Sequence, residues 1–357
     1  MDNLDLPPKV LQALQKLEIT TSITSVLEMS VPELVKTTKL SEHEVEMLKK
    51  AVSERVYTRP RFVTAYDFYL IRCKLSLGCP ILDEYLSGGI RPEGITEIYG
   101  ESACGKTQVC LQLCLMVQLP LKLGGLEGGA VYICTEDKFP AKRLEQMKPQ
   151  FKQQYREFLR DTNVGDNIFV KHVVDVKGLI DILDNKLPVL MKRTKVKLLV
   201  IDSITALFRV EYSMDEMYER AQVLNRIGAR LVQLSHKNNM PVVCVNQVAA
   251  VFDRPVRDTK CKIHDYVKPC LGKTWSSWVT VRIMLLRSTG QHLAERQLPK
   301  GESDNPEREL VVIFSRTGDH SPLDKAMKAC RYTVDASGVH GILVKDTDDK
   351  CCICGHD

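Results

Sequence analysis

The spacing of apolar side chains divides the chain into a short N-terminal part of helical pattern and a longer part of mixed pattern. In residues 1–54, Val45, Leu48 and Val52 fall on one face of the last helical segment. Two serines also precede a glutamate by three positions, which is the spacing of a capping box at the start of a helix. These pairs are Ser30 with Glu33 and Ser41 with Glu44. We therefore expect a small all-α N-terminal domain.

From about residue 76, short apolar runs alternate with longer segments of helical pattern, which predicts a parallel sheet with helices on its faces. The runs are ITEIY, AVYICT, IFVKHV, KLLVID and PVVCVN. The later runs WVTVRIMLL, RELVVIFS and RYTVDA are joined by short or polar connections and indicate an antiparallel extension. We expect an α/β core over residues 76–346, joined to the N-terminal domain by a linker at 55–75.

Composition is ordinary for a soluble globular protein, with 44% apolar and 27% charged residues among 357. The sequence has no run of about 18 apolar residues, so we expect no membrane-spanning helix. The N-terminus resembles neither a secretory signal nor a transit peptide, so the 13 cysteines indicate mostly free thiols in a reducing compartment. The formal charge of +5 favours an anionic partner only mildly.

The stretch GESACGKT, Gly100–Thr107, matches the phosphate-binding pattern G-x-x-x-x-G-K-[ST] and lies between a predicted strand and a predicted helix. Its glycines let successive backbone N–H groups and the helix N-terminus point at phosphate oxygens. We expect Lys106 to neutralise the β- and γ-phosphate oxygens and the Thr107 hydroxyl to hold Mg²⁺. The predicted cofactor-binding residues of this loop are Gly100, Glu101, Ser102, Ala103, Cys104, Gly105, Lys106 and Thr107.

Polar side chains end three of the predicted strands, at the sheet edge where α/β folds bind ligands. Asp202 ends KLLVID and is the candidate second Mg²⁺ residue, Glu136 follows VYICT and is placed to orient an attacking water, and Gln247 follows PVVCVN and is placed to sense a γ-phosphate. Each also has an ordinary structural interpretation. These are a helix cap for Asp202, a solvated strand-end acid for Glu136 and a polar loop start for Gln247.

Together these motifs resemble the RecA family, specifically the strand-exchange recombinases of eukaryotes and archaea and their paralogues. The matching runs, in the family's order and spacing, are GGIRPEGITEIYGESACGKTQVCLQL, AVYICTEDKF, LLVIDSITALFR and VVCVNQV. The similarity extends over roughly residues 55–345. It implies a RecA-like P-loop ATPase core that binds ATP at Gly100–Thr107, with Mg²⁺ at Thr107 and Asp202.

The resemblance also implies roles at the ATP site. Glu136 would polarise the lytic water, Lys106 would contact the phosphates, and Gln247 would couple the γ-phosphate to a DNA-facing loop. Arg143, in FPAKRL, falls where the family places an arginine against the adenine face, and an exposed helix charge is the alternative. In such assemblies ATP lies between neighbouring subunits, and Asp319, in GDHSP, is a candidate cap for a neighbour's nucleotide.

The linker contains FVTA, in which Phe62 and Ala65 match the family's Phe-x-x-Ala polymerisation motif. The resemblance implies that these side chains dock into pockets of an adjacent subunit, where a buried aromatic anchor contributes much of the binding energy. The alternative is a phenylalanine that packs on its own chain.

Two loops of the family face DNA. The first corresponds to residues 212–222, where three acids against one arginine disfavour contact with phosphates. The second, at about 249–274, has six cations against three aspartates, and we expect it either to contact the DNA backbone or to be a solvated mobile loop. Its cations are Arg254, Arg257, Lys260, Lys262, Lys268 and Lys273.

The two ends of the chain show weaker signals. The N-terminal domain has no glycine at either predicted hairpin, so we expect protein docking or structural support there rather than strong DNA binding. The C-terminal residues 347–357 carry Cys351 and Cys354 at C-x-x-C spacing without the usual second pair of ligands. We expect this tail to be disordered, and a metal shared between chains is the alternative.

The resemblance implies a role in homologous-recombination repair of DNA double-strand breaks. We expect the chain to pair with another RecA-family paralogue and to support filaments of the main strand-exchange recombinase on single-stranded or branched DNA. It would be a weak DNA-dependent ATPase of the nucleus, with a further pool in the cytoplasm. An alternative is a non-hydrolysing structural adaptor with a vestigial nucleotide site, whereas the lack of an obvious Arg-rich lid disfavours a small-molecule kinase.

Overall fold

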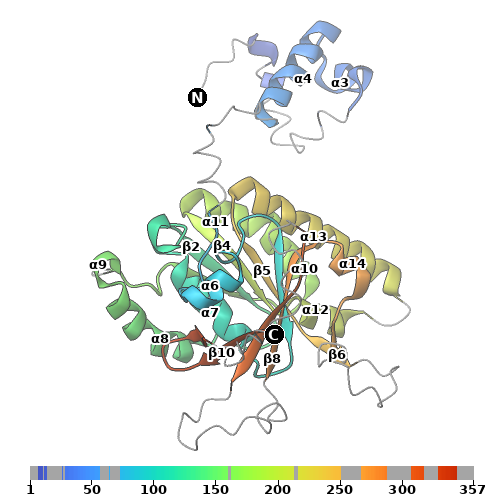
Figure 1. The fold of residues 1–357 in the computed structure, drawn as a ribbon. Coiled ribbons are helices and arrows are strands. Elements are labelled where there is room, and N and C mark those ends of the chain that lie inside the picture. Colours follow the sequence, from blue (N-terminus) through green and yellow to red (C-terminus); the bar gives the residue numbers. More distant parts are fainter. Residues whose placement is uncertain are drawn as a thin grey trace, which may run out of the picture. The chain divides into compact units, whose positions relative to one another are not determined.

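The chain forms two compact units, which divide between residues 68 and 69 (Figure 1). The computed structural model describes most of the larger unit and part of the smaller one. The described residues are 7–10, 12–13, 26, 29–56, 64, 73–159, 162–212, 216–250, 267–287, 307–316 and 329–343.

The described part of the smaller unit is helical, as predicted. Helix α3 spans Val31–Thr38 and helix α4 spans Glu42–Val56. Both capping boxes are present, because the Glu33 and Glu44 carboxylates each accept hydrogen bonds from the backbone and hydroxyl of their serine at 2.8 Å. These bonds lower the pKa of both carboxyl groups. The buried apolar cluster of this unit comprises Val10, Val26, Leu34, Leu40, Val45, Leu48 and Val52.

The larger unit is built on a nine-stranded sheet of order β11-β10-β9-β8-β1-β5-β4-β2-β3. The strands β3, β2, β4, β5, β1 and β8 are parallel, and β9, β10 and β11 continue the sheet in antiparallel pairing. The strand bounds are β1 Ile95–Gly100, β2 Gly129–Cys134, β3 Ile168–His172, β4 Val196–Asp202, β5 Val242–Asn246, β8 Val279–Arg287, β9 Arg308–Ser315, β10 Cys330–Val334 and β11 Val339–Gly341.

The predicted architecture is confirmed with one correction. The run WVTVRIMLL, expected in the antiparallel extension, forms β8 and pairs parallel with β1, so the antiparallel part begins at β9. The direction of β8 depends on the segment that connects it to β5. Residues 267–276 of that segment include a short strand and a helix, and the chain returns through them to the edge of the sheet where β1 and β5 begin.

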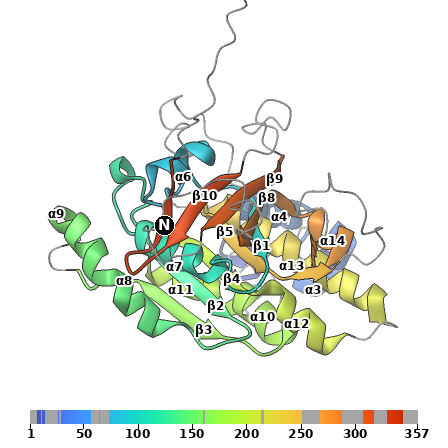
Figure 2. The ribbon, with the colours of Figure 1, turned by 60° about the horizontal axis from the view of Figure 1, so that its bottom comes forward.

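Helices cover both faces of the sheet, and two buried cores result (Figure 2). Helices α6, α7 and α8 contribute to one core, and α10 to α14 contribute to the other. Side chains of the central strands alternate between them: in β4, Leu198 and Val200 join the first core, and Leu199 and Ile201 join the second. The helix bounds are α6 Pro80–Tyr85, α7 Lys106–Met116, α8 Ala141–Gln154, α9 Arg156–Leu159, α10 Val176–Asp181, α11 Leu187–Arg193, α12 Ile204–Glu211, α13 Met217–Asn238 and α14 Gly272–Ser276, with short η1 Leu121–Leu123 and η2 Ile182–Lys186.

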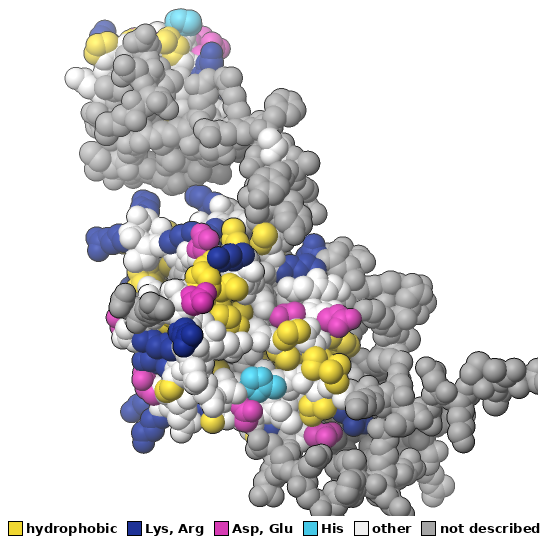
Figure 3. Space-filling model, turned by 60° about the vertical axis from the view of Figure 1, so that its left-hand side comes forward, with side chains coloured by type: hydrophobic (Ala, Val, Ile, Leu, Met, Phe, Trp, Pro, Cys, Tyr) yellow, Lys and Arg dark blue, Asp and Glu magenta, His cyan; other side chains and the backbone are white. Residues whose placement is uncertain are grey.

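The surface of the larger unit is chemically mixed. On the face shown in Figure 3, cationic side chains lie mainly along one margin, and hydrophobic and acidic side chains are interspersed. The most exposed large apolar side chains of the described residues come from three separate segments: Val174, the adjacent Met217 and Tyr218, and Leu343. Within the described ranges, no helix is long and apolar enough to cross a membrane.

The fully buried carboxylate of Glu97 links three strands in the middle of the sheet to helix α14, which packs on one face of the sheet. Glu97 of β1 accepts hydrogen bonds from Asn246 of β5 at 2.6 Å and from the indole of Trp275 in α14 at 2.9 Å. It also forms an ion pair with Arg282 of β8, which is itself buried. Such a network stabilises the fold only while every member has its partners.

Replacing Glu97 with alanine is expected to destabilise the fold by about 3–5 kcal/mol, because a buried guanidinium loses its counter-charge. Glu145→Ala, which removes an exposed ion pair with Lys148 at 2.7 Å, is the matched control and should cost less than about 1 kcal/mol. Denaturant unfolding of both variants measures the difference. Equal losses in the two variants would show that the buried network contributes nothing beyond a surface pair.

Candidate nucleotide site

The phosphate loop connects the end of β1 to the start of α7 in a backbone conformation that requires glycine. Gly105 precedes the helix with φ of 101°, in the left-handed region that favours glycine. At Gly100, a Cβ atom would lie 2.1 Å from the backbone oxygen of Leu285 in β8. The loop therefore keeps its shape only because both pattern positions lack a side chain.

Lys106 and Thr107 open helix α7, and their side chains bond the loop backbone and the end of β4. The Lys106 ammonium donates to the carbonyl oxygens of Gly100 at 2.8 Å and Glu101 at 2.6 Å, so it lies across the loop. The Thr107 hydroxyl donates to Asp202 Oδ2 at 2.8 Å. A cation and a hydroxyl–carboxylate pair thus stand beside the loop, which fits a Mg²⁺-bound phosphate.

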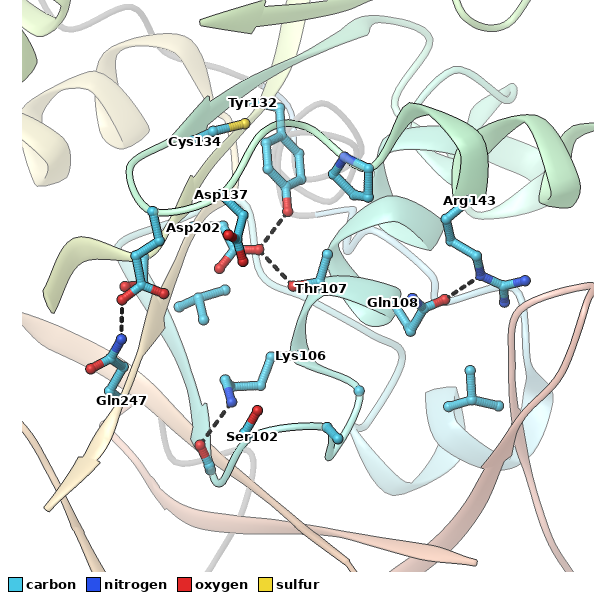
Figure 4. A pocket seen from close by; sticks show the side chains of 18 of the residues that line it. Ser102, Lys106, Thr107, Gln108, Tyr132, Cys134, Asp137, Arg143, Asp202 and Gln247 are labelled. Atoms are coloured by element: carbon cyan, nitrogen blue, oxygen red, sulfur yellow. Dashed lines mark hydrogen bonds between the residues drawn. The ribbon is translucent and has the colours of Figure 1, made fainter. Parts of the chain in front are cut away.

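Tyr132 is a member of the site that the sequence analysis missed. Its hydroxyl donates to the same Asp202 oxygen at 2.6 Å, and its ring is buried in β2 (Figure 4). Burial raises the pKa of Tyr132, and the neighbouring carboxylate acts in the same direction, so the hydroxyl stays a donor. The available signal was a tyrosine inside an apolar strand, since a buried phenol needs a hydrogen-bond partner.

Glu136 and Gln247 follow β2 and β5, the two strands that flank β4 in the sheet, and their side chains contact one another. The Gln247 side-chain amide donates to Glu136 Oε1. Burial, reinforced by the negative charge of Asp202, raises the pKa of Glu136. The side-chain oxygen of Gln247, Oε1, is buried and has no hydrogen-bond partner within the described residues. Beside the loop, this pair therefore presents the Glu136 carboxylate, whose pKa is raised, and the Gln247 side-chain oxygen, which can accept a hydrogen bond.

Arg143 of α8 is fixed between two elements at the side of the loop. Its Nε donates to Gln108 of α7 at 2.6 Å. Its terminal nitrogens donate to the backbone oxygens of Asp335 and, at 3.3 Å, Ala336, in the turn after β10. The guanidinium is therefore oriented by the protein, which differs from the exposed helix charge that was the alternative prediction.

These groups surround one cavity of about 810 Å³, of the size that small-molecule sites usually have. The lining includes Lys106, Thr107, Glu136, Asp202, Gln247 and Arg143, from α7, α8 and the ends of three strands (Figure 4). Of the eight predicted loop residues, Glu101 and Cys104 are not part of the lining, and Cys104 is fully buried. The lining residues that the sequence analysis did not single out include Gln108, Tyr132, Cys134, Asp137, Arg209, Arg308 and Val334.

The two predicted DNA loops are shorter than expected. Residues 217–222 of the first form the start of α13, and the second is bounded by a two-stranded ribbon, β6 Val248–Ala250 with β7 Val267–Pro269. The bounds of both loops were taken from the family resemblance, which did not fix where α13 begins or where the ribbon ends. Of the predicted cations, Lys268 lies on β7 and Lys273 on α14, and both are exposed.

The remaining candidates lie outside the described residues. They are Phe62, Ala65, Arg254, Arg257, Lys260, Lys262, Asp319, Cys351 and Cys354. Among the residues that the structure does describe, no group of three or more His, Cys, Asp or Glu side chains is arranged to hold a metal ion.

Comparison with known proteins matches both units to families. A model of the Rad51 family matches residues 71–318, and a model described as an XRCC3/RpoA-like helix-hairpin-helix domain matches residues 1–56. In the described hairpin between α3 and α4, the left-handed position is taken by Lys39, with φ of 57°, in place of a glycine.

Curated relatives cover nearly the whole chain. The DNA repair protein XRCC3 of Mus musculus is 37% identical over 354 residues, and that of Bos taurus is 38% identical over 363 residues, each covering 96% of this chain and 98% of the relative. The DNA repair and recombination protein RadA of Aeropyrum pernix is 37% identical over 251 residues, covering 68% of this chain and 74% of the relative. The loop geometry, the strand-end side chains and these matches agree, and the chain belongs to the Rad51 family of RecA-like proteins.

Proposed function

We propose that this chain is an ATP-binding recombinase paralogue of homologous-recombination DNA repair. The observation that carries the proposal is the meeting of Lys106, Thr107 and Asp202 around one cavity, with Glu136 and Gln247 on the adjoining strand ends. The names of the relatives from mouse, cattle and Aeropyrum pernix, all DNA repair or recombination proteins, support the biological role.

In this proposal, the loop backbone and Lys106 bind the phosphates of ATP, and Thr107 and Asp202 hold Mg²⁺. Mg²⁺ would neutralise charge on the phosphate oxygens. Tyr132 keeps the Asp202 carboxylate oriented through its 2.6 Å hydrogen bond. Arg143 lines the cavity beside Gln108, where it is placed to contact the base.

Glu136 is the proposed general base for slow, DNA-dependent ATP hydrolysis. Its raised pKa brings the carboxylate closer to the basicity that proton abstraction needs near neutral pH. Gln247 bonds this carboxylate through its side chain, and its backbone oxygen accepts a hydrogen bond from Cys270 at 2.9 Å. Because residues 248–250 and 267–269 form the base of the second predicted DNA loop, Gln247 is placed to couple nucleotide state to that loop.

The proposed assembly is heteromeric. Phe62 and Ala65 of the linker dock this chain to another RecA-family paralogue, and the complex supports filaments of the main strand-exchange recombinase on single-stranded or branched DNA in the nucleus. Lys268 and Lys273, with the four other cations of the second loop, supply contacts to the DNA backbone. The adaptor hypothesis differs in one respect: it needs the linker contact but no nucleotide.

Lys106→Ala and Phe62→Ala separate these two hypotheses when ATP binding and partner co-purification are both measured. Lys106→Ala is expected to weaken ATP binding about tenfold or more, because it removes charge-assisted hydrogen bonds to phosphate. Phe62→Ala is expected to leave ATP binding unchanged and to weaken partner recovery by a similar factor, since it removes a buried aromatic anchor.

The exposed Lys192 of α11 and Phe158 of α9 supply matched controls, as Lys192→Ala and Phe158→Ala. Unchanged ATP affinity in Lys106→Ala would remove the phosphate-loop assignment and leave the adaptor. Full partner recovery with Phe62→Ala would remove the linker assignment.

Glu136→Gln is expected to retain ATP binding and to lower DNA-stimulated hydrolysis by about 10²–10⁴-fold, the usual contribution of a general base. In the wild-type chain, hydrolysis should decline as pH falls through the Glu136 pKa, at a higher pH than an ordinary glutamate would give. Steady-state phosphate release as a function of pH measures both effects. Hydrolysis by Glu136→Gln at the rate of an exposed control, Glu145→Gln, would rule out this role.

A further inference from the structure

The phosphate loop is held on its outer side by the antiparallel extension of the sheet. The hydroxyl of Tyr332, in β10, donates to the backbone oxygen of Cys104 at 2.5 Å. The ring of Tyr332 is fully buried, so this hydroxyl has no solvent to bond. Burial raises the pKa of Tyr332, which keeps the hydroxyl protonated and therefore a donor.

This contact determines where the next backbone N–H points. The oxygen of Cys104 and the N–H of Gly105 belong to one planar peptide unit and point in opposite directions. A donor that holds the Cys104 oxygen toward β10 therefore turns the Gly105 N–H away from β10. Gly105 lines the nucleotide cavity and immediately precedes α7, so its N–H is among the groups that a bound phosphate would meet.

A neighbouring residue makes the same kind of contact. Arg308 of β9 donates from Nε to the backbone oxygen of Ala103 at 3.4 Å, and it also lines the cavity. The Ala103 oxygen shares a peptide unit with the Cys104 N–H. Two successive peptide units are thus held from the antiparallel extension, one by a short hydrogen bond and one by a longer one.

The packing between β10 and the loop is close. A Cβ atom added to Gly105 would lie 3.6 Å from the Tyr332 hydroxyl oxygen and 3.5 Å from the Val334 side chain. Gly105 is also in the left-handed region, with φ of 101°. The left-handed turn therefore favours glycine here, and β10 lies within ordinary van der Waals reach of the loop.

We propose that Tyr332 is a positioning residue for phosphate binding: its hydroxyl orients the Cys104–Gly105 peptide so that the Gly105 N–H faces the nucleotide phosphates. The proposal rests on the ATP-binding function proposed above. Tyr332 of β10 lies outside the phosphate-binding pattern Gly100–Thr107, so strand β10 would contribute to the site as well. Because the N–H is already oriented before the nucleotide binds, the free-energy cost of reorienting it is avoided, and the affinity for phosphate is higher.

Tyr332→Phe removes the hydroxyl and leaves the ring in place. The matched control is Tyr85→Phe, because the Tyr85 hydroxyl bonds the same extension, accepting from the Val312 N–H of β9 at 3.3 Å, without touching the loop. ATP affinity of the full chain should fall about fivefold in Tyr332→Phe, the size of one typical hydrogen bond, and should stay at the wild-type value in Tyr85→Phe.

Two further measurements separate positioning from general stability. Adenosine affinity, measured by competition, should be unchanged in Tyr332→Phe, because adenosine has no phosphate for the loop to bind. Backbone hydrogen exchange of residues 101–105 without nucleotide should be faster in Tyr332→Phe than in Tyr85→Phe, while the thermal midpoints of the two variants stay close. Equal losses of ATP and adenosine affinity in Tyr332→Phe would overturn the proposal in favour of a purely structural hydroxyl.

The outcome for the wild-type chain distinguishes this proposal from the function on which it rests. If wild-type protein binds ATP and Tyr332→Phe binds it equally well, only the positioning role is overturned. If wild-type protein fails to bind ATP, the proposed function and the positioning role are both overturned.

Discussion

A carboxylate at the end of a buried strand is the constraint on which the site depends. Asp202 follows four apolar residues of β4 that are packed into both cores, so its place at the sheet edge is fixed by the fold. A charge in such surroundings requires donors or a cation. Thr107 and Tyr132 supply two donors to one oxygen, which brings the start of α7 and the middle of β2 to the same point.

The buried network around Glu97 stabilises the sheet and also reaches the edge of the sheet at which Asp202 and Gln247 lie. Asn246, which bonds Glu97, is the residue before Gln247. Thr205 of α12 joins the two, because its hydroxyl donates to the Asn246 side chain and accepts from the Gln247 backbone N–H. The backbone at the Gln247 side of the cavity is therefore held by interactions in the middle of the sheet, and substitutions there are expected to affect both folding and the site.

Local patterns in the sequence were sufficient for the features that depend on neighbouring residues. Gly100–Thr107 is a contiguous motif, and Ser30 with Glu33 forms a bond across three positions, so both could be recognised directly. The edge position of Asp202, Glu136 and Gln247 also followed, because parallel strands bring their carboxyl ends together. These predictions required only the order of apolar and polar residues.

The features that were missed depend on partners far along the chain. Tyr332 contacts a residue 228 positions away, and Tyr132 contacts one 70 positions away, so no local pattern identifies the partner of either hydroxyl. The parallel direction of β8 was missed because it depends on pairing with β1, which no pattern within β8 records. The acidic residues around Glu219 were read as a loop, although apolar residues at helical spacing follow from Leu224 and continue α13.

In the proposed site, Asp202 and Thr107 hold Mg²⁺ beside phosphates bound by the loop. The most direct test is the affinity for ATP with Mg²⁺ and with a chelator, measured for the wild-type chain and for Asp202→Asn, which keeps an oxygen acceptor for Thr107 and Tyr132. Mg²⁺ should strengthen binding by the wild-type chain about tenfold or more and should have little effect on the variant. The same Mg²⁺ dependence in both proteins would contradict the account.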